Sequence, residues 1–279
     1  MMAIARIGNH MQIIPISIEI MRPPKDHLLA KIERAKPAIK SGDIIAITSK
    51  VVSIWQGRCM LKSAVADKDD LIRKEADHYL DRENVPGGHV IHTLKNNLLI
   101  PSAGIDESNA AGYYILWPKD PEKSARRILS FFRRRYGVKN CGVIITDSRS
   151  MPFRRGVVGV AIGWAGFDPL YDYRGKKDLF GRELRVSQTN VADALAAAAV
   201  FAMGEGAEQT PMVIIRDAPR IRFFSGEPRA RRRVHGSFIV SMRDDLFAPF
   251  LRGVRWKRGG GAKRNGGSRT RKHKKIVNQ

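Results

Sequence analysis

The chain has 279 residues, enough for one large domain or two small ones, and its 43% hydrophobic content is ample for a packed core. Its formal net charge of +23 suggests nucleic acid as a partner, but residues 216–279 hold 19 Lys and Arg against 4 Asp and Glu, which leaves +8 for the rest. No apolar run of membrane-spanning length and no signal-peptide pattern occurs, so we expect a cytoplasmic protein without membrane contact.

The first half of the chain predicts both strands and helices. Residues 43–54, DIIAITSKVVSI, predict two strands separated by a turn near Ser49 and Lys50. Residues 26–39 and 68–83 show helical spacing of apolar residues with charged opposite faces. The stretch IHTLKNNLLIPSAGID predicts a strand, a turn and a second strand.

The second half contains the clearest helical patterns. Residues 121–136 begin with a proline and place apolar side chains along one side, and residues 190–204 extend from a candidate N-cap, Asn190, to Gly204. The segments CGVIITD, GVVGVAIGWAG and PMVIIRD predict strands. Because these elements lack the regular alternation of a doubly wound sheet, we expect an α+β (mixed α/β) fold.

Three carboxylates stand where the chain leaves a predicted strand or helix. Asp106 follows AGI, Asp147 follows IIT, and Glu205 lies in MGEG after the alanine-rich helix. Such oxygen ligands suit a hard divalent cation that also binds phosphate, although aspartates in these places commonly cap turns instead. The sequence has neither a GxxxxGKS/T phosphate loop nor a GxGxxG motif before a helix, so a nucleotide would be bound by another arrangement.

Three other features leave a structural and a chemical interpretation open. The segments DYRGKKDLFGR and GRELRVS predict either a solvated hairpin or a clamp for phosphate and carboxylate groups, with Arg182 as donor. Cys59 and Cys141 form no CxxC pair and have no histidine at metal-ligand spacing, so we expect buried fillers. From residue 252 the chain is basic and glycine-rich, which is typical of a solubilising arm or of one that binds RNA or another polyanion without sequence preference.

Seven blocks together carry a resemblance over residues 15–217. SGDIIAITSKVVS, AGIDESN, VIITDS, FRRGVVGVAIGWAG, DYRGKKDLFGREL, VAD and MGEG, in this order, resemble the coenzyme F420:L-glutamate ligase family. The resemblance implies a two-part γ-glutamyl ligase fold that forms a homodimer. It also implies an enzyme that uses GTP, Mg²⁺ or Mn²⁺, and K⁺ to add L-glutamate by a γ-linkage to the coenzyme F420 precursor through an acyl phosphate. On this basis we expect a ligase-like domain over residues 1–217, an extension of undefined structure over 218–251 and a disordered basic tail over 252–279.

The resemblance also implies roles for individual residues. The metal ligands are Asp106, Asp147, Ser148 and Glu205, and the three carboxylates among them are the catalytic residues. Nucleotide contacts are implied at Ser49, Lys50, Asn109, Met203, Gly204, Glu205, Gly206 and Thr210, and at residues 20–23. The cations that we assign to glutamate or to the acceptor are Arg149, Arg154, Arg155 and Arg182.

Three positions depart from the patterns of many members. Ile54 stands in place of a lysine, Ser150 in place of the glycine of TDTxGR, and Ala194 in place of the acid of VADE. TDSR, GWAGFDPLYDYRG and SQTNVADALAAAAV are more similar to a subgroup proposed to act on folates, so the acceptor is a deazaflavin precursor or, alternatively, a folate. Two non-enzyme hypotheses also stay open: a nucleotide-binding regulator without turnover, favoured by Ile54 and Ala194, and a basic RNA-binding protein.

Overall fold

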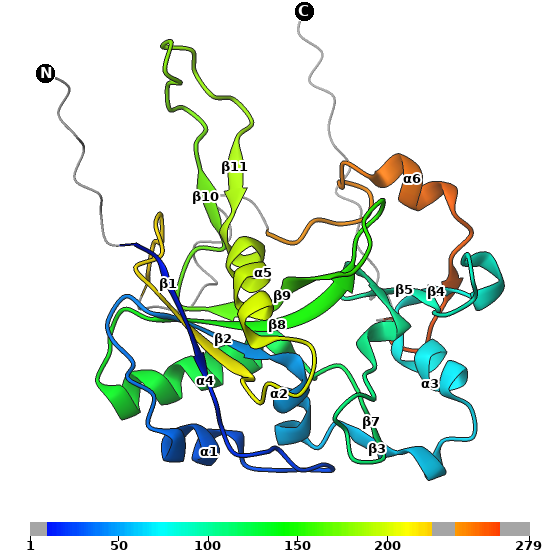
Figure 1. The fold of residues 1–279 in the computed structure, drawn as a ribbon. Helices are drawn as coiled ribbons and strands as arrows, with labels where there is room; N and C mark the ends of the chain where they lie inside the picture. The colour runs from blue at the N-terminus through cyan, green and yellow to red at the C-terminus, as the bar shows by residue number, and fades with distance from the viewer. Residues whose placement is uncertain (1–9, 225–237, 263–279) are drawn as a thin grey trace, which may run out of the picture.

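A five-stranded sheet forms the centre of the molecule, in a computed structural model that describes residues 10–224 and 238–262 (Figure 1). Its strand order is β1-β12-β2-β8-β9, in which β2 and β8 are parallel and the other neighbours antiparallel. The strands are β1 (Gln12–Ile16), β2 (Ile44–Thr48), β8 (Gly142–Ser150), β9 (Val157–Ala165) and β12 (Met212–Arg216). The inner strands have continuous apolar sequences because both faces of the sheet are covered.

Helices lie on both faces of this sheet, as Figure 1 shows. The helix α5 (Val191–Met203) packs on one face, and α1 (Leu28–Ala35), α2 (Ser49–Gln56) and α4 (Pro121–Tyr136) pack on the other. Successive residues of β8 therefore belong to different layers. Val143 and Ile145 lie in the core below α2 and α4, whereas Ile144 lies in the core below α5.

The two helices with the clearest sequence patterns are confirmed, together with their caps. Asp120 accepts a hydrogen bond from Lys123 N–H at the start of α4 (3.0 Å), and Gly137 ends this helix in the left-handed region. Asn190 Oδ1 accepts from Asp193 N–H at the start of α5 (3.0 Å), as its candidate N-cap role predicts.

Two predicted elements are wrong in part. The prediction of a second strand after Ser49 fails because residues 49–56 form α2, whose Val51, Val52 and Ile54 are buried. An apolar run without alternation fits a buried helix as well as a strand, so its periodicity did not distinguish the two. The predicted helix over 68–83 ends at Glu75, after which the chain enters a strand.

A smaller sheet has the order β13-β4-β5-β6. Its strands are β4 (His78–Leu80), β5 (His92–Lys95), β6 (Leu98–Pro101) and β13 (Lys257–Arg258). β5 and β6 form the predicted strand-turn-strand unit. The helix α3 (Lys68–Glu75) contributes Leu71 and Ile72 to a separate core cluster together with residues from β5 to β7. β6 also contacts β8, so the two sheets meet at the strand that carries Asp147.

The remaining described elements are short. They are the paired strands β3 (Cys59–Leu61) and β7 (Tyr113–Ile115), the hairpin strands β10 (Leu170–Asp172) and β11 (Gln188–Asn190), the helix α6 (Ala248–Gly253), and 3₁₀ turns at Lys62–Ala64, Arg82–Asn84 and Ser102–Gly104. The β10–β11 hairpin projects from the body (Figure 1), and Leu179 and Phe180 between its strands are exposed. Across the described ranges, six α-helices and four sheets confirm a mixed α/β protein. Cys141 is buried as expected, and Cys59 is partly buried.

The C-terminal segment corrects one prediction. Residues 252–262 were expected to be disordered, but Lys257 and Arg258 pair with Tyr79 and His78 of β4. Beyond them, Gly259 N–H donates to Asp77 O (2.9 Å). The basic composition did not reveal this pairing because a β-edge is recognised through backbone groups, which composition does not encode. Residues 263–279 lie outside the described part of the chain.

Candidate functional site

Hydrogen bonds join four sequence blocks that lie far apart along the chain. Lys50, at the start of α2, contacts Asp106 and Ser108 in the segment between β6 and β7. Asn109 of the same segment donates to Gly206 O after α5 (2.7 Å), and Ser148 of β8 donates to Glu205 (2.6 Å). The predicted metal and nucleotide residues of these blocks are therefore brought into one region.

The Asp106 carboxylate contacts three neighbouring donors. Lys50 Nζ lies 2.7 Å from Asp106 Oδ2, and the N–H and hydroxyl of Ser108 donate to Oδ1 at 2.8 and 2.9 Å. Burial opposes ionisation of Asp106, but the donors outweigh it and lower the pKa of this carboxyl below its ordinary value. Asp106 therefore stands as a carboxylate paired with a cation.

Asp147 has the opposite environment. It lies within β8, opposite Val160, and not at the strand end as expected, because β8 continues to Ser150. Its Oδ1 accepts from Ser148 N–H (2.8 Å), whereas its Oδ2 is sealed from solvent and has no hydrogen-bond partner. Burial, and then repulsion from the nearby carboxylates, raises the pKa of Asp147 to about 7, against the stabilising effect of Ser148 and Ser49.

The segment after α5 is held in place by side-chain contacts. Thr210 Oγ1 donates to Met203 O (2.8 Å), which closes the loop between α5 and β12. Gly206 N–H donates to Glu208 Oε2 within the loop (2.8 Å). Together with Asn109, these contacts fix the segment to which the resemblance assigns the nucleotide.

The carboxylates fit a cation, but they do not form a finished metal-ligand group. Within residues 10–224 and 238–262, no three His, Cys, Asp or Glu side chains converge as metal ligands. Lys50 lies against Asp106, and Ser148 bonds to Glu205. The unpartnered Oδ2 of Asp147 is nevertheless a buried carboxyl oxygen that a cation would satisfy. The metal assignment stays a prediction that this donor set supports.

The four candidate arginines differ in environment. Arg154, Arg155 and Arg182 are exposed, and Arg154 donates to the neighbouring Phe153 O (3.0 Å). Arg149 of β8 is partly buried, and its Nε is sealed from solvent without a hydrogen-bond partner. Arg149 is therefore the one whose surroundings differ from those of an ordinary solvated arginine.

Comparison with known proteins places the chain among ligases. The model of the F420-0:gamma-glutamyl ligase family matches residues 16–217. The chain belongs to this family. It is 36% identical to the coenzyme F420:L-glutamate ligase of Methanopyrus kandleri over 255 residues, which cover 85% of this chain and 97% of that protein. The proteins of the same name from Methanococcus maripaludis strain C7 and Methanocaldococcus jannaschii are 37% and 34% identical over 75% and 78% of this chain, and over 89% and 92% of their own lengths.

The departures from the ligase family's patterns fall at positions without a contact to the carboxylates. Ile54 is only 2% exposed and packs in the core beneath α2, so this position does not face the carboxylates. Ala194 and Ser150 are exposed. Asp193, beside Ala194, accepts from Ala161 N–H of β9 (2.9 Å) and so connects α5 to the sheet.

Three residues of this candidate site were missed by the sequence analysis. Ser108 follows Asp106 at the spacing of an Asx turn, a local signal that could have identified it. Gly104 and Trp117 left no such signal, because they meet only in the fold. A Cβ on Gly104 would lie 2.2 Å from the Trp117 ring and 3.5 Å from Asp147 Oδ2, so a larger residue would displace the ring beside the carboxylate.

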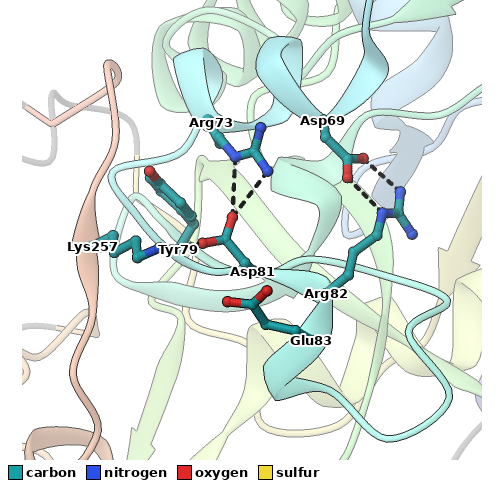
Figure 2. A pocket seen from close by; sticks show the side chains of 7 residues that line it. All are labelled: Asp69, Arg73, Tyr79, Asp81, Arg82, Glu83 and Lys257. Atoms are coloured by element: carbon teal, nitrogen blue, oxygen red, sulfur yellow. Dashed lines mark hydrogen bonds and ion pairs between the residues drawn. The ribbon is translucent and has the colours of Figure 1, made fainter.

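The described part of the chain also has an open polar pocket of about 440 Å³ on its surface, away from the predicted site residues. Figure 2 shows its lining, which consists of Asp69, Arg73, Tyr79, Asp81, Arg82, Glu83 and Lys257. Arg82 donates twice to Asp69 (2.6 Å each), and Arg73 and Lys257 both contact Asp81. The cations are already neutralised by these carboxylates, so we assign no substrate to the cavity. No helix in the described ranges is long and apolar enough to cross a bilayer.

Proposed function

We propose that this protein is a GTP-dependent γ-glutamyl ligase that joins L-glutamate to the coenzyme F420 precursor. Family membership supports the reaction class, because the similar proteins from Methanopyrus kandleri and Methanococcus maripaludis are named coenzyme F420:L-glutamate ligases. The observation that carries the proposal is the sealed and unpartnered Oδ2 of Asp147, which lies within the electrostatic reach of Asp106 and Glu205. A ligase that handles GTP phosphates requires such a set of anionic ligands.

The proposed reaction has two steps. An oxygen of the acceptor carboxylate attacks the γ-phosphorus of GTP. The bond between this phosphorus and the oxygen that bridges it to the β-phosphate breaks, so GDP departs and an acyl phosphate remains on the acceptor. The amine of L-glutamate then attacks the acyl carbon, the carbon–oxygen bond to phosphate breaks, and the amine loses a proton as the amide forms. A divalent ion held by Asp106, Asp147 and Glu205 would neutralise charge on the phosphate oxygens.

Residues of this chain position the reacting region. Lys50 connects α2 to the segment of Asp106, and Asn109 connects that segment to Gly206. The hydroxyl of Ser148 orients Glu205. Because these contacts come from rigid element ends, they hold the carboxylates in fixed directions before substrates bind.

The test is the conversion of substrates by the purified protein. GTP, L-glutamate and Mg²⁺ or Mn²⁺ are supplied with either a deazaflavin precursor or a folate, and products are read by mass. We expect the deazaflavin product to gain one glutamyl residue, with one GDP formed per amide. Formation of a glutamyl folate alone would replace the deazaflavin precursor as acceptor, and GTP that binds without being converted to GDP would favour a regulator. A homodimer and a role for K⁺ are further parts of the proposal, to be checked by mass in solution and by rates measured with and without K⁺.

A further inference from the structure

On β8, two residues of opposite charge that lie two positions apart each have a buried polar atom. Asp147 Oδ2 and Arg149 Nε are both sealed from solvent, and neither has a hydrogen-bond partner among the described residues. Side chains at positions i and i+2 of a strand point to the same face of a sheet. A carboxylate and a guanidinium so placed commonly pair, yet here no ion pair joins them.

The alternation along β8 shows which face they share. Val143 and Ile145 lie in the core below α2 and α4, and Asp147 and Arg149 continue this series. Thr146 contacts Met203, and Ser148 contacts Glu205, so the even positions face the segment after α5. Arg149 therefore lies on the same face of β8 as Asp147.

Arg149 is only partly buried, but its Nε–H is sealed from solvent and has no acceptor. A sealed donor without an acceptor carries a desolvation penalty, which a hydrogen-bonded anion would offset. Arg154, Arg155 and Arg182 avoid this penalty because they are exposed. The desolvation penalty at Arg149 is offset if an anionic group of a ligand binds there and accepts the hydrogen bond.

We propose that Arg149 is a subsite for an anionic group of the acceptor, a phosphate or a carboxylate, adjacent to the cation site at Asp147. This assignment rests on the proposed ligase function. The planar guanidinium donates two parallel hydrogen bonds to such a group and holds the acceptor beside Asp147. In this arrangement Arg149 binds the acceptor, whereas Asp147 helps to hold the cation for the phosphoryl group.

The experiment compares Arg149→Gln, Arg149→Lys and a matched control. Arg134→Gln removes the same charge from an exposed position in the last turn of α4. Affinity for the deazaflavin precursor is measured by calorimetry without GTP, and GTP affinity is measured separately. The KM for each of the three substrates follows from initial rates, and the melting temperature of the ligand-free protein is recorded for every variant.

We expect Arg149→Gln to weaken acceptor binding by about 10- to 100-fold, the ratio that corresponds to hydrogen bonds with a charged partner. Arg149→Lys should fall between parent and Gln variant because it keeps the charge but loses the fork. GTP affinity and the glutamate KM should stay at parental values. The melting temperature should stay equal or rise, since a sealed N–H without an acceptor is removed.

Three outcomes would overturn the subsite. Unchanged acceptor affinity in Arg149→Gln removes it, whereas weaker binding of GTP or a higher KM for glutamate assigns the arginine to another substrate. A lower melting temperature with unchanged acceptor affinity shows a structural role. Absence of turnover in the unsubstituted protein contradicts the ligase function and leaves the calorimetric comparison to decide the role of Arg149. A parent that does not bind the deazaflavin precursor contradicts the acceptor assignment itself.

Discussion

Asp147 and Asp26 have the same side chain, and their surroundings displace their pKa values in opposite directions. Burial and then neighbouring carboxylates raise the pKa of Asp147 to about 7. Burial also favours the neutral acid at Asp26, but hydrogen bonds from Lys31 and two backbone N–H groups outweigh it and lower the pKa to about 2. The supply of donors, more than burial alone, decides the direction of the pKa shift at these two carboxyls.

The substitution Asp147→Asn tests the candidate ligand. The amide has nearly the same size but no anionic oxygen, so the fold should persist while kcat falls by about 100- to 1000-fold, as for the loss of one preorganised electrostatic contact. Turnover is measured at saturating Mg²⁺ or Mn²⁺, and the melting temperature reports folding. Near-parental turnover under these conditions would contradict the role of Asp147.

The substitution Asp26→Asn tests the structural carboxylate. Asp26 lies 2.7 Å from Lys31 Nζ, which also donates to Ile20 O, so the pair holds the segment before α1. Since the folded pKa lies below the ordinary value of 3.8, the contribution of the pair is present above pH 4 and is lost as pH falls from 4 towards 2. At pH 7 the variant should lose about 1 kcal/mol of unfolding free energy, because solvent contact reduces the effect of the shift.

Urea denaturation of parent and Asp26→Asn at pH 7, 4 and 2 measures this dependence. The two proteins should become nearly equally stable at pH 2, where about half of the folded parental carboxyl is protonated. Glu19→Gln is the control, because Glu19 and Arg34 form a solvent-exposed pair that contributes little. A stability difference that is the same at all three pH values would disprove the linkage.

Among the helices and strands, those whose own sequence carries both a start and a stop signal were predicted correctly. α4 and α5 combine an N-cap, helical spacing and a terminal glycine, and the structure matches both. α2 was mistaken for a strand because Val51, Val52 and Ile54 resume the apolar pattern of β2, although Gly57, its left-handed C-cap, was a visible stop signal. β13 could not be predicted, since a strand of two residues is defined by its partner β4 and not by its own sequence.

The pairing of the C-terminal segment leads to a prediction at Gly261. Gly260 N–H donates to Arg73 O (3.0 Å), and Gly261 N–H donates to Ala76 O (2.9 Å), so the glycines lie directly against the end of α3. A Cβ on Gly261 would lie 2.3 Å from Glu75 O. Gly261→Val should therefore destabilise the protein by about 1 to 3 kcal/mol, the range for an overpacked contact.

Chemical denaturation of Gly261→Val measures this loss against a matched glycine. Gly253→Ala is the control, because a Cβ at Gly253 would meet no atom within 4 Å. The control should change stability by less than about 0.5 kcal/mol. Equal stability of the two variants would show that the segment does not stay bound to α3 in solution.

At the scale of the whole molecule, the composition showed where basic residues gather along the chain, but it did not show which contacts they make. The three carboxylate blocks could be predicted to meet through family resemblance, and hydrogen bonds from Ser148 to Glu205 and from Asn109 to Gly206 connect them. The engagement of Asp106 by Lys50 could not be predicted, because it depends on where the smaller sheet packs. The surplus of basic residues near the C-terminus was visible, but the docking of residues 257–261 was not.

The final prediction separates the docked segment from the basic residues beyond it. Residues 263–279 contain 7 Lys and Arg and no acidic residue. Removing them by a cut after Ala262 should leave the melting temperature and ligase turnover unchanged, because β13 and the glycines against α3 remain. Binding to single-stranded homopolymeric RNA should weaken, and the slope of log affinity against log salt should fall by up to about 5, since each lost cation no longer releases a counterion. A cut after Val254 is the comparison, because it also removes β13 and should lower the melting temperature.

Fluorescence anisotropy over a salt series measures RNA affinity. Unchanged binding after the Ala262 cut would place the RNA contact elsewhere. Lost turnover at an unchanged melting temperature would show that residues 263–279 belong to the catalytic site.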